Sequence, residues 1–283
     1  MTQWERLLLW RRVVWRWLLP AVFAAYVTLG LIGRVIAPSD PSQVALNERY
    51  IPPLTSFEHV LGTDHLGRDV LSRILVGASI SLSVAAIAIL VASMFGVTIG
   101  MVSGFLGGPI DALFMRFADA MLSLPTIMVA LLLVAVLEPG FWSVIIAIML
   151  VSWARYARFV RGEVLSLRSR EFIDAAIICG TPSLQVLWRH FLPNVINSVV
   201  VLLTLDIGRV ILLESSLAFL GLGLPPDRGA WGSSIYEGKA YLQFAPWIAL
   251  MPGLAIMITV ILANSFGNWL SDCLDPRLRS SET

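Results

Sequence analysis

Charged residues are scarce in this chain: Asp, Glu, Lys and Arg make up only 14% of its 283 residues. Soluble domains usually carry about 25% of these residues. Hydrophobic residues make up 57% of the sequence, and the mean hydropathy is +0.81. One water-facing core cannot hide so much apolar surface. The shortage of charge therefore excludes an ordinary soluble domain and indicates an integral membrane protein.

Patterns that carry chemistry are missing as well. The sequence has no Gly-x4-Gly-Lys-Ser/Thr phosphate loop, no His-Glu-x-x-His and no Gly-x-Ser-x-Gly. Cys179 and Cys273 are the only cysteines, and neither has a second cysteine at metal-site spacing. His59 and His65 are six residues apart and share no obvious helical face. We therefore expect no enzyme activity, no cofactor bound by this chain, no metal site and no nucleic-acid partner.

Long apolar runs are what the chain does have. A helix needs about 20 apolar residues to cross a bilayer. Six runs approach or exceed that length, and they predict spans at Leu18–Ala37, Ser79–Val102, Ala118–Leu137, Gly140–Tyr156, Val195–Leu213 and Pro246–Leu270. The predicted fold is therefore an all-α integral membrane protein with six transmembrane helices.

The distribution of Arg and Lys predicts the orientation. With the N-terminus inside, thirteen arginines fall in inner segments, six Arg or Lys residues fall in outer segments, and Arg209 lies within a span. Cytoplasmic loops carry the excess of basic residues, so both termini are predicted to be cytoplasmic. The first apolar run is longer than a signal-peptide core and lacks an Ala-x-Ala-like site, so we expect it to be retained.

These boundaries predict four segments along the chain. We expect a cytoplasmic interfacial segment, a first span with an external loop, a transmembrane core containing a cytoplasmic loop at 155–193, and a cytoplasmic tail. Their ranges are 1–17, 18–78, 79–270 and 271–283.

The loop at 155–193 contains the most specific pattern. Glu171–Gly180 is rich in small residues, and Leu192-Pro193 follows before the fifth predicted span. Ala175, Ala176 and Gly180 would leave one helix surface low enough for a partner protein to approach closely. The alternative is an ordinary basic inner loop, whose arginines only set the orientation.

A second pattern, Gly-Thr-Asp-His-Leu-Gly-Arg-Asp at Gly62–Asp69, precedes the second predicted span. Thr63 or Asp64 can cap the N-terminus of a helix here. The alternative is that the segment is only a capped helix lying on the outer membrane surface.

Three charged residues fall in the fifth predicted span, namely Asp206, Arg209 and Glu214. A charge at the bilayer centre costs at least about 2.5–3.5 kcal/mol on insertion scales. Asp206 and Arg209 are three residues apart, so they lie on one side of a helix and are predicted to pair. They could brace the helices or line a pathway, and an intramembrane enzyme built around the three is the alternative of a different class.

The segment Glu171–Gly180 with Leu192-Pro193 resembles the coupling loop of ABC importer permeases, and Gly62–Asp69 resembles the segment before their second span. The resemblance covers about Leu61 to Arg277. It is to the C-type permease subunit of the dipeptide, oligopeptide and nickel importers. Asp174 stands where the family usually has Glu.

The resemblance implies a type I ABC importer permease fold in the inner membrane, forming half of a pathway. Its implied partners are a homologous second permease subunit, two ATPase subunits that bind ATP and Mg, an extracytoplasmic substrate-binding protein, and the lipid bilayer. The implied solutes are di- or oligopeptides, with nickel chelates or glutathione-type solutes as alternatives. The residues implied to couple to the ATPase are Glu171, Phe172, Asp174, Ala175, Ala176 and Gly180.

Overall fold

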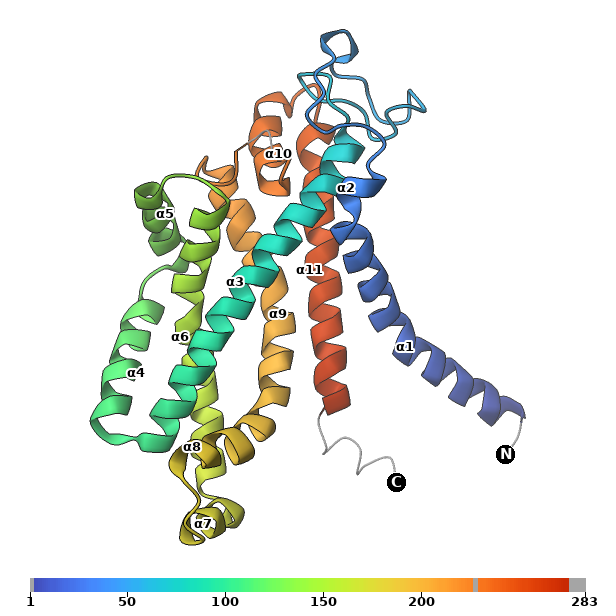
Figure 1. Ribbon diagram of the computed structural model, residues 1–283. Helices are drawn as coiled ribbons and strands as arrows, with labels where there is room; N and C mark the ends of the chain where they lie inside the picture. Colours follow the sequence, from blue (N-terminus) through green and yellow to red (C-terminus); the bar gives the residue numbers. More distant parts are fainter. Residues whose placement is uncertain (1–2, 226–228, 275–283) are drawn as a thin grey trace. The chain divides into compact units, whose positions relative to one another are not determined.

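Helices make up most of the part that the computed structural model describes, residues 3–225 and 229–274 (Figure 1). The α-helices are α1 (Gln3–Leu31), α2 (Gly33–Ile36), α3 (Val70–Leu106), α4 (Gly108–Ser123), α5 (Thr126–Leu137), α6 (Phe141–Arg168), α7 (Glu171–Ile178), α8 (Ser183–Val186), α9 (Leu192–Phe219), α10 (Trp231–Gly238) and α11 (Trp247–Leu274). Short 3-10 turns lie at η1 (Leu46–Glu48) and η4 (Lys239–Tyr241), and a π-helical turn lies at η2 (Leu187–Phe191). Within these residues no β-strand forms, and Thr63 and Asp69 make a single isolated bridge.

The chain divides into two compact units. One unit comprises Met1–Ser83 with Ile207–Thr283, and the other comprises Val84–Asp206. The long helices α3 and α9 each contain a boundary between the two units. The packing is therefore described within each unit.

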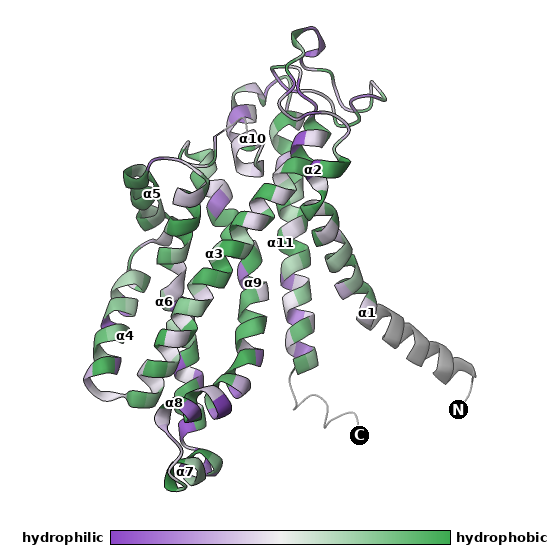
Figure 2. Cartoon of the chain, viewed as in Figure 1, coloured by the Kyte–Doolittle hydropathy of each residue, from purple (hydrophilic) through white to green (hydrophobic). Residues whose placement is uncertain are grey.

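Four helical segments are long and apolar enough to cross a membrane: α3, α6, the continuous run Ser183–Phe219, and α11. A fifth is added if α4 and α5 count as one bent span. Figure 2 shows these segments mostly in the colours of hydrophobic residues, whereas hydrophilic residues gather in the loop between α2 and α3. The all-helical membrane fold is confirmed, while six spans and the placement of both termini stay predictions.

The third predicted span, Ala118–Leu137, is broken in the structure. The helices α4 and α5 meet at an angle of 94° (Figure 1). Leu124 between them is extended, with φ −87° and ψ 143°. A proline disfavours helical geometry in the residue before it, and Pro125 follows Leu124 directly. Pro125 therefore explains the break, which the hydropathy of the run alone does not reveal.

Three other helices differ from their predicted ranges. The helix α6 continues to Arg168, well past the predicted end of its span at Tyr156, and α3 already begins at Val70. At the N-terminus α1 is one helix with Pro20 inside it, and its apolar part, Trp17–Leu31, is shorter than a typical span. The predicted end of α6 and start of α3 therefore fall inside these helices, whereas the predicted end of the first span, Ala37, lies beyond the end of α1.

In the unit Val84–Asp206, α3 packs closely against α6 through a stripe of glycines. Gly96, Gly100 and Gly104 are spaced four residues apart and share one face of α3. A Cβ on Gly100 would lie 2.5 Å from the carbonyl oxygen of Ala157, and a Cβ on Gly96 would lie 2.5 Å from that of Trp153. Small residues at this spacing are typical of close helix contacts in membranes.

The other unit is built around α11. The hydroxyls of Tyr26 on α1 and Thr259 on α11 are 2.6 Å apart, and the rings of Phe23 and Phe266 stack with centroids 4.6 Å apart. The helix α10 lies so close to α11 that a Cβ on Gly238 would be 2.7 Å from the backbone nitrogen of Ala249. These contacts fix α1 and α10 on the same central helix.

Candidate functional site

The helix α7 forms where the sequence predicts a short coupling helix. Glu171 and Asp174 lie in its first turn, where negative charge is favourable against the positive end of the helix dipole. The helix ends at Ile178, and Gly180, two residues later, has a φ of +76°. The Gly180 N–H donates to the carbonyl of Ile177 at 2.9 Å, and the Thr181 N–H donates to that of Ala176 at 3.1 Å. This pair of bonds needs a left-handed residue, which explains the glycine.

One buried side chain anchors α7 to the unit Val84–Asp206. Ile173 is fully buried in a hydrophobic cluster with Val164 of α6, Met101 of α3 and Val195 of α9. The other predicted coupling residues lie outward: Glu171, Phe172, Asp174, Ala175 and Gly180 are exposed, and Ala176 is half-buried. The structure thus brings all six together on one helix and its cap.

Exposed apolar side chains surround these residues, and the sequence analysis did not single them out. They lie on α7, α8 and η2, and they are Phe172, Ile177, Ile178, Leu184 and Trp188. Ile178 is 85% exposed and Leu184 is 67% exposed. Exposed apolar groups gathered in this way are typical of surfaces that contact another protein or a membrane. The signal in the sequence was the apolar pair at 177–178, directly before the glycine cap.

Three arginines of α6 pair with carboxylates inside the same unit. Arg161 donates to both oxygens of Asp111 on α4, at 2.5 Å and 2.6 Å. Arg158 forms an ion pair with Asp119 of α4. Arg155 pairs with Asp206 of α9. The sequence analysis placed these arginines in a loop, but they tie α6 to its two neighbours. We call the set Arg155, Arg158 and Arg161 the arginine ladder.

Asp206 is fully buried, as its place within a predicted span required. Arg155 and the hydroxyl of Tyr156 both donate to its carboxylate, the latter at 2.6 Å. The predicted pairing with Arg209 stays a prediction. Arg209 and Glu214 belong to the other unit and are considered with it.

Glu214 is 1% exposed on α9. Its Oε2 atom accepts from the hydroxyls of Ser81 on α3 at 3.3 Å and Ser215 at 3.4 Å. Its Oε1 atom is buried without a hydrogen-bond partner in the described part of the chain. Glu214 therefore links α9 to α3 through one oxygen only.

The segment Gly62–Asp69 is a buried charged turn and not the predicted capped helix. Asp64 accepts from Arg68 Nε at 2.6 Å. Arg68 and Arg73 also donate to the same Glu237 oxygen on α10, at 2.9 Å and 2.6 Å. This network ties the start of α3 to α10, a role that the sequence analysis could not assign because Glu237 is far along the chain.

The cap of α3 is Asp69, which corrects the predicted Thr63 or Asp64. Asp69 directly precedes Val70, the first residue of α3, which is the position that an N-cap residue takes. Its Oδ2 atom accepts a hydrogen bond from the Ser72 N–H at 2.7 Å. Thr63 instead accepts at its carbonyl from the indole of Trp247 at 3.0 Å. Both candidates are therefore used in the turn before the helix.

Two histidines near this turn have pKa values shifted in opposite directions. The ring nitrogens of His59 lie 3.1 Å from Asp69 Oδ1 and 3.3 Å from Glu48 Oε2. Burial lowers the pKa of His59, but the two carboxylates outweigh it and leave the pKa above its ordinary value. Burial lowers the pKa of His65, whose ring stacks on Tyr241 with centroids 4.9 Å apart. Within residues 3–225 and 229–274, no three His, Cys, Asp or Glu side chains are placed to hold a metal.

Comparison with known proteins gives a consistent result. Residues 96–280 match the family described as the inner membrane component of binding-protein-dependent transport systems. The chain is 36% identical to the dipeptide transport system permease protein DppC of Alkalihalophilus pseudofirmus, over 92% of this chain and 84% of the relative. It is 38% identical to the nickel transport system permease protein NikC of Escherichia coli K12, over 91% of this chain and 92% of the relative. It is 39% identical to the glutathione transport system permease protein GsiD of Pectobacterium atrosepticum, over 80% and 75%.

Proposed function

Because the chain belongs to the family of inner membrane components of binding-protein-dependent transport systems, we propose that it forms half of the translocation pathway of a peptide importer. As a member of that family it is a transport subunit of the inner membrane and not an enzyme. The intramembrane enzyme considered for Asp206, Arg209 and Glu214 is therefore set aside.

The proposed partners follow from the kind of system. A homologous permease subunit supplies the other half of the pathway, two ATPase subunits bind ATP and Mg, and an extracytoplasmic binding protein delivers the solute. We further propose six spans with both termini in the cytoplasm, so that α7 faces the ATPases. The arginine excess of the inner segments supports this orientation.

The observation that carries the proposal is the surface of α7. It combines exposed Phe172 and Ile178 with the small side chain of Ala175 on a helix held by one buried anchor, Ile173. We propose that Glu171, Phe172, Asp174, Ala175, Ala176 and Gly180 contact an ATPase subunit. Closure of the ATPase pair on ATP then displaces α7.

The arginine ladder gives this displacement a route within the unit. Since α7 follows α6 after only two residues and Ile173 packs on Val164, a shift of α7 pulls on α6. The bidentate bond from Arg161 to Asp111 and the bond from Arg155 to Asp206 carry α4 and α9 along. On this proposal Asp206 acts as a brace, and Glu214 braces α9 against α3 through Ser81.

The test is to add a charge on α7 in the assembled transporter. Ala175→Glu places a carboxylate in the proposed interface, next to Glu171 and Asp174. We expect solute uptake and solute-stimulated ATPase activity to fall together by about tenfold or more, because an unpaired interface charge costs binding energy. The matched control is Ser166→Glu, which adds the same charge at an exposed position of α6. Uptake by assembled Ala175→Glu at the wild-type rate would refute the assignment.

Peptides are the proposed solutes, since the dipeptide permease matches over 92% of this chain. The nickel and glutathione permeases have a similar sequence identity to this chain, so nickel chelates and glutathione remain the competing solutes. Identifying the ligand that co-purifies with the cognate binding protein decides among the three. A bound nickel chelate or glutathione in place of peptide would overturn the solute assignment and leave the transport assignment intact.

A further inference from the structure

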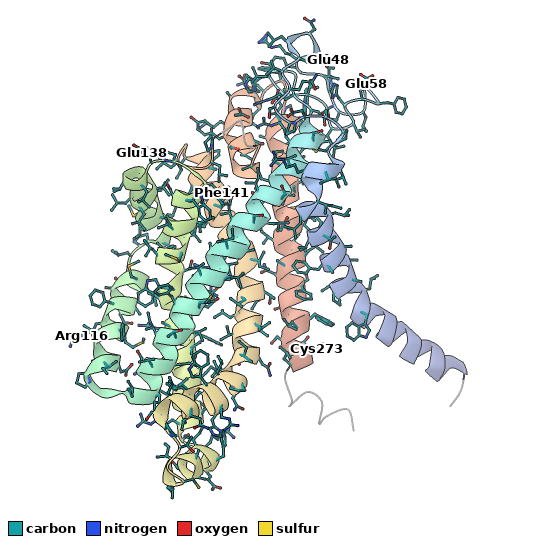
Figure 3. The ribbon with its side chains drawn as sticks, in the orientation of Figure 1. Glu48, Glu58, Arg116, Glu138, Phe141 and Cys273 are labelled. Atoms are coloured by element: carbon teal, nitrogen blue, oxygen red, sulfur yellow. The ribbon has the colours of Figure 1, made fainter. Side chains whose placement is uncertain are left out.

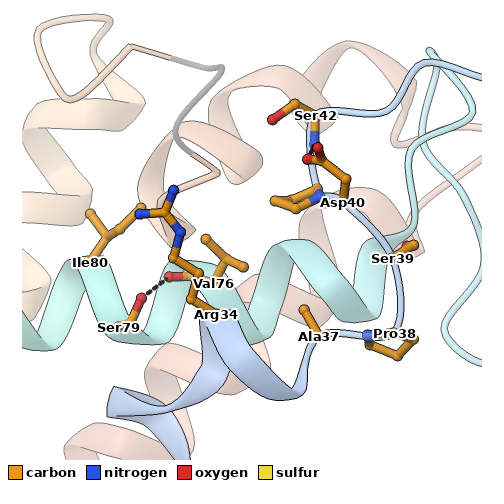
Figure 4. A pocket seen from close by; sticks show the side chains of 10 residues that line it. Arg34, Ala37, Pro38, Ser39, Asp40, Ser42, Val76, Ser79 and Ile80 are labelled. Carbon is orange, nitrogen blue, oxygen red and sulfur yellow. Dashed lines mark hydrogen bonds between the residues drawn. The ribbon is translucent and has the colours of Figure 1, made fainter.

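A cavity of about 750 Å³ lies between α2, the loop that follows it, and α3 (Figure 4). Its walls come from one unit only, and they include Arg34, Ser39, Asp40, Ser42, Val76 and Ser79. The Ser39 hydroxyl lies 3.0 Å from that of Ser72 on α3, which fixes the loop wall against the helix. The cavity is within the usual size range of sites for small ligands, about 300–1,000 Å³.

The lining has one cation and one anion, and they are not paired with each other. Figure 4 shows the guanidinium of Arg34 and the carboxylate of Asp40 on opposite sides of the space. Within the described residues Arg34 makes no hydrogen bond or ion pair. Asp40 accepts one bond, from the Ser42 N–H at 2.8 Å to Oδ1. A ligand with separate negative and positive groups would satisfy both.

Apolar side chains surround Arg34 on its own helix. At the end of α1 and on α2, Leu31 is 51% exposed, Ile32 41%, Val35 85% and Ile36 42%. In a membrane protein, exposed apolar groups at the end of an apolar helix face acyl chains, while an arginine among them reaches the headgroup layer. The cavity therefore lies beside the end of an apolar helix, a position at which we expect lipid headgroups.

We propose that this cavity binds the headgroup of an ethanolamine-type phospholipid. The phosphate would lie on Arg34, whose planar guanidinium matches phosphate oxygens in pairs. The primary ammonium would donate to Asp40. A soluble zwitterion offers the same two charges, but the apolar residues next to Arg34 favour a ligand that carries acyl chains.

The test measures lipid retention by the purified full chain, within its assembled complex, using native mass spectrometry in detergent. The lipids added are phosphatidylethanolamine, phosphatidylglycerol and phosphatidylcholine. We expect retention of phosphatidylethanolamine at roughly tenfold lower concentration than the other two, because phosphatidylglycerol lacks the ammonium and phosphatidylcholine cannot donate a hydrogen bond to Asp40. Asp40→Asn should abolish this preference, whereas Arg34→Gln should lower the retention of all three lipids, because each of them carries the phosphate.

The control variants are Arg116→Gln on α4 and Glu138→Gln at the turn between α5 and α6, both far from the cavity in sequence (Figure 3). They should keep the preference. Equal retention of the three lipids by the wild type, or a preference that survives Asp40→Asn, would overturn the proposal. If Arg34→Gln does not assemble, Asp40→Asn still decides, since it changes no volume.

A second arm distinguishes the lipid from a soluble ligand. Soluble O-phosphoethanolamine is titrated against protein in detergent without phospholipid, and binding is followed by calorimetry. Weak or absent binding supports the lipid assignment, because the acyl chains then supply part of the affinity. Binding as tight as that of phosphatidylethanolamine would assign the cavity to a soluble zwitterion and overturn the lipid proposal. Neither arm depends on transport activity.

Discussion

At the scale of single residues, solvent exposure decides how much each ion pair of the arginine ladder contributes to stability. Asp206 is fully buried, so its charge depends on Arg155 and Tyr156. The side chains of Arg158 and Asp119 are 53% and 54% exposed, so water screens that pair. Exposed ion pairs contribute about 0–1 kcal/mol, whereas removing one partner of a buried pair costs about 3–5 kcal/mol.

Arg155→Ala should therefore reduce the amount of assembled complex far more than Arg158→Ala, one turn further along the same helix. We expect a cost toward the lower end of about 3–5 kcal/mol for Arg155→Ala, because its own side chain is 40% exposed. Size-exclusion profiles and Tm values of the two variants measure the difference. Equal losses would show that Asp206 does not rely on Arg155.

The predicted partner Arg209 is tested in the same series. If Arg209 also neutralises Asp206, Arg209→Ala should lower Tm, and Asp206→Leu combined with Arg209→Met should restore much of the loss. Recovered assembly with recovered uptake makes the pair a brace. Recovered assembly without uptake would place it on the pathway.

His59 makes stability depend on pH in a defined direction. The pKa of His59 is raised in the folded protein. Its bonds to Asp69 and Glu48 therefore contribute their full stabilisation of the fold at pH values below its ordinary pKa of 6.5. The contribution is lost as the pH rises through the raised pKa. The Tm difference between wild type and His59→Gln should thus be large near pH 5.5 (about one unit below the ordinary value) and shrink in alkali.

Two variants control this measurement. Glu58→Gln changes an exposed neighbour of His59 and should leave the pH profile unchanged (Figure 3). His65→Gln should behave in the opposite way, because the pKa of His65 is lowered and its protonation opposes folding in acid. A Tm difference for His59→Gln that grows with pH would contradict the assignment.

At the scale of elements, the glycine stripe of α3 sets the distance between α3 and α6. At Gly96 and Gly100 the atoms nearest to an added Cβ include the carbonyl oxygens of Trp153 and Ala157, and at Gly104 they are side-chain atoms of Val164. The two helices therefore lie too close together for larger side chains on this face of α3. Gly162 on α6 provides a contrast, because a Cβ there would meet nothing within 4 Å.

Gly100→Ala and Gly162→Ala should therefore change stability in opposite directions. A Cβ at Gly100 would lie 2.5 Å from the Ala157 oxygen and must push the helices apart, so Tm should fall. At Gly162 the same change gains up to about 1 kcal/mol of helix propensity, so Tm should hold or rise. A fall of equal size in both variants would show that the stripe does not set the packing.

The sequence predicts the existence of the elements better than their ends. The apolar runs predicted the positions of α3, α6, α9 and α11, but not the break within Ala118–Leu137. The end of α6 was missed because Arg155 and Arg158 read as loop residues while their carboxylate partners lie elsewhere in the sequence. The break at Pro125 was visible in principle, but the apolar content of the run outweighed one proline.

At the scale of the whole molecule, the short helix α7 and the glycine after it could be predicted from the local sequence pattern, while the coupling role of its residues stays a prediction. The network of Arg68, Arg73 and Glu237 could not, since it joins residues more than 160 positions apart. Sequence patterning therefore gives the local elements, and long-range polar pairs come only from the fold.

The proposed orientation makes a simple prediction about labelling. Cys179 is exposed and Cys273 partly so, which gives the native chain cytoplasmic reporters if the orientation is right. An impermeant thiol reagent should reach Cys179 only after the membrane is opened. In a variant with both cysteines replaced by serine, Phe57→Cys should react in intact cells, because Phe57 is fully exposed in the loop that is predicted to be external. The reverse pattern would invert the topology.

The arginine ladder also implies an order of events during biogenesis. When α6 leaves the ribosome, Asp206 has not yet been synthesised, so Arg155 enters the bilayer region as a free cation. Arg158 and Arg161 can pair with Asp119 and Asp111 only once α4 and α6 have met. The three charges would thus first favour keeping the end of α6 on the side that is predicted to be cytoplasmic, and would later tie α6 to α4 and α9. The same guanidinium groups would thus act as an orientation signal during membrane insertion and as helix-linking ion pairs in the folded protein.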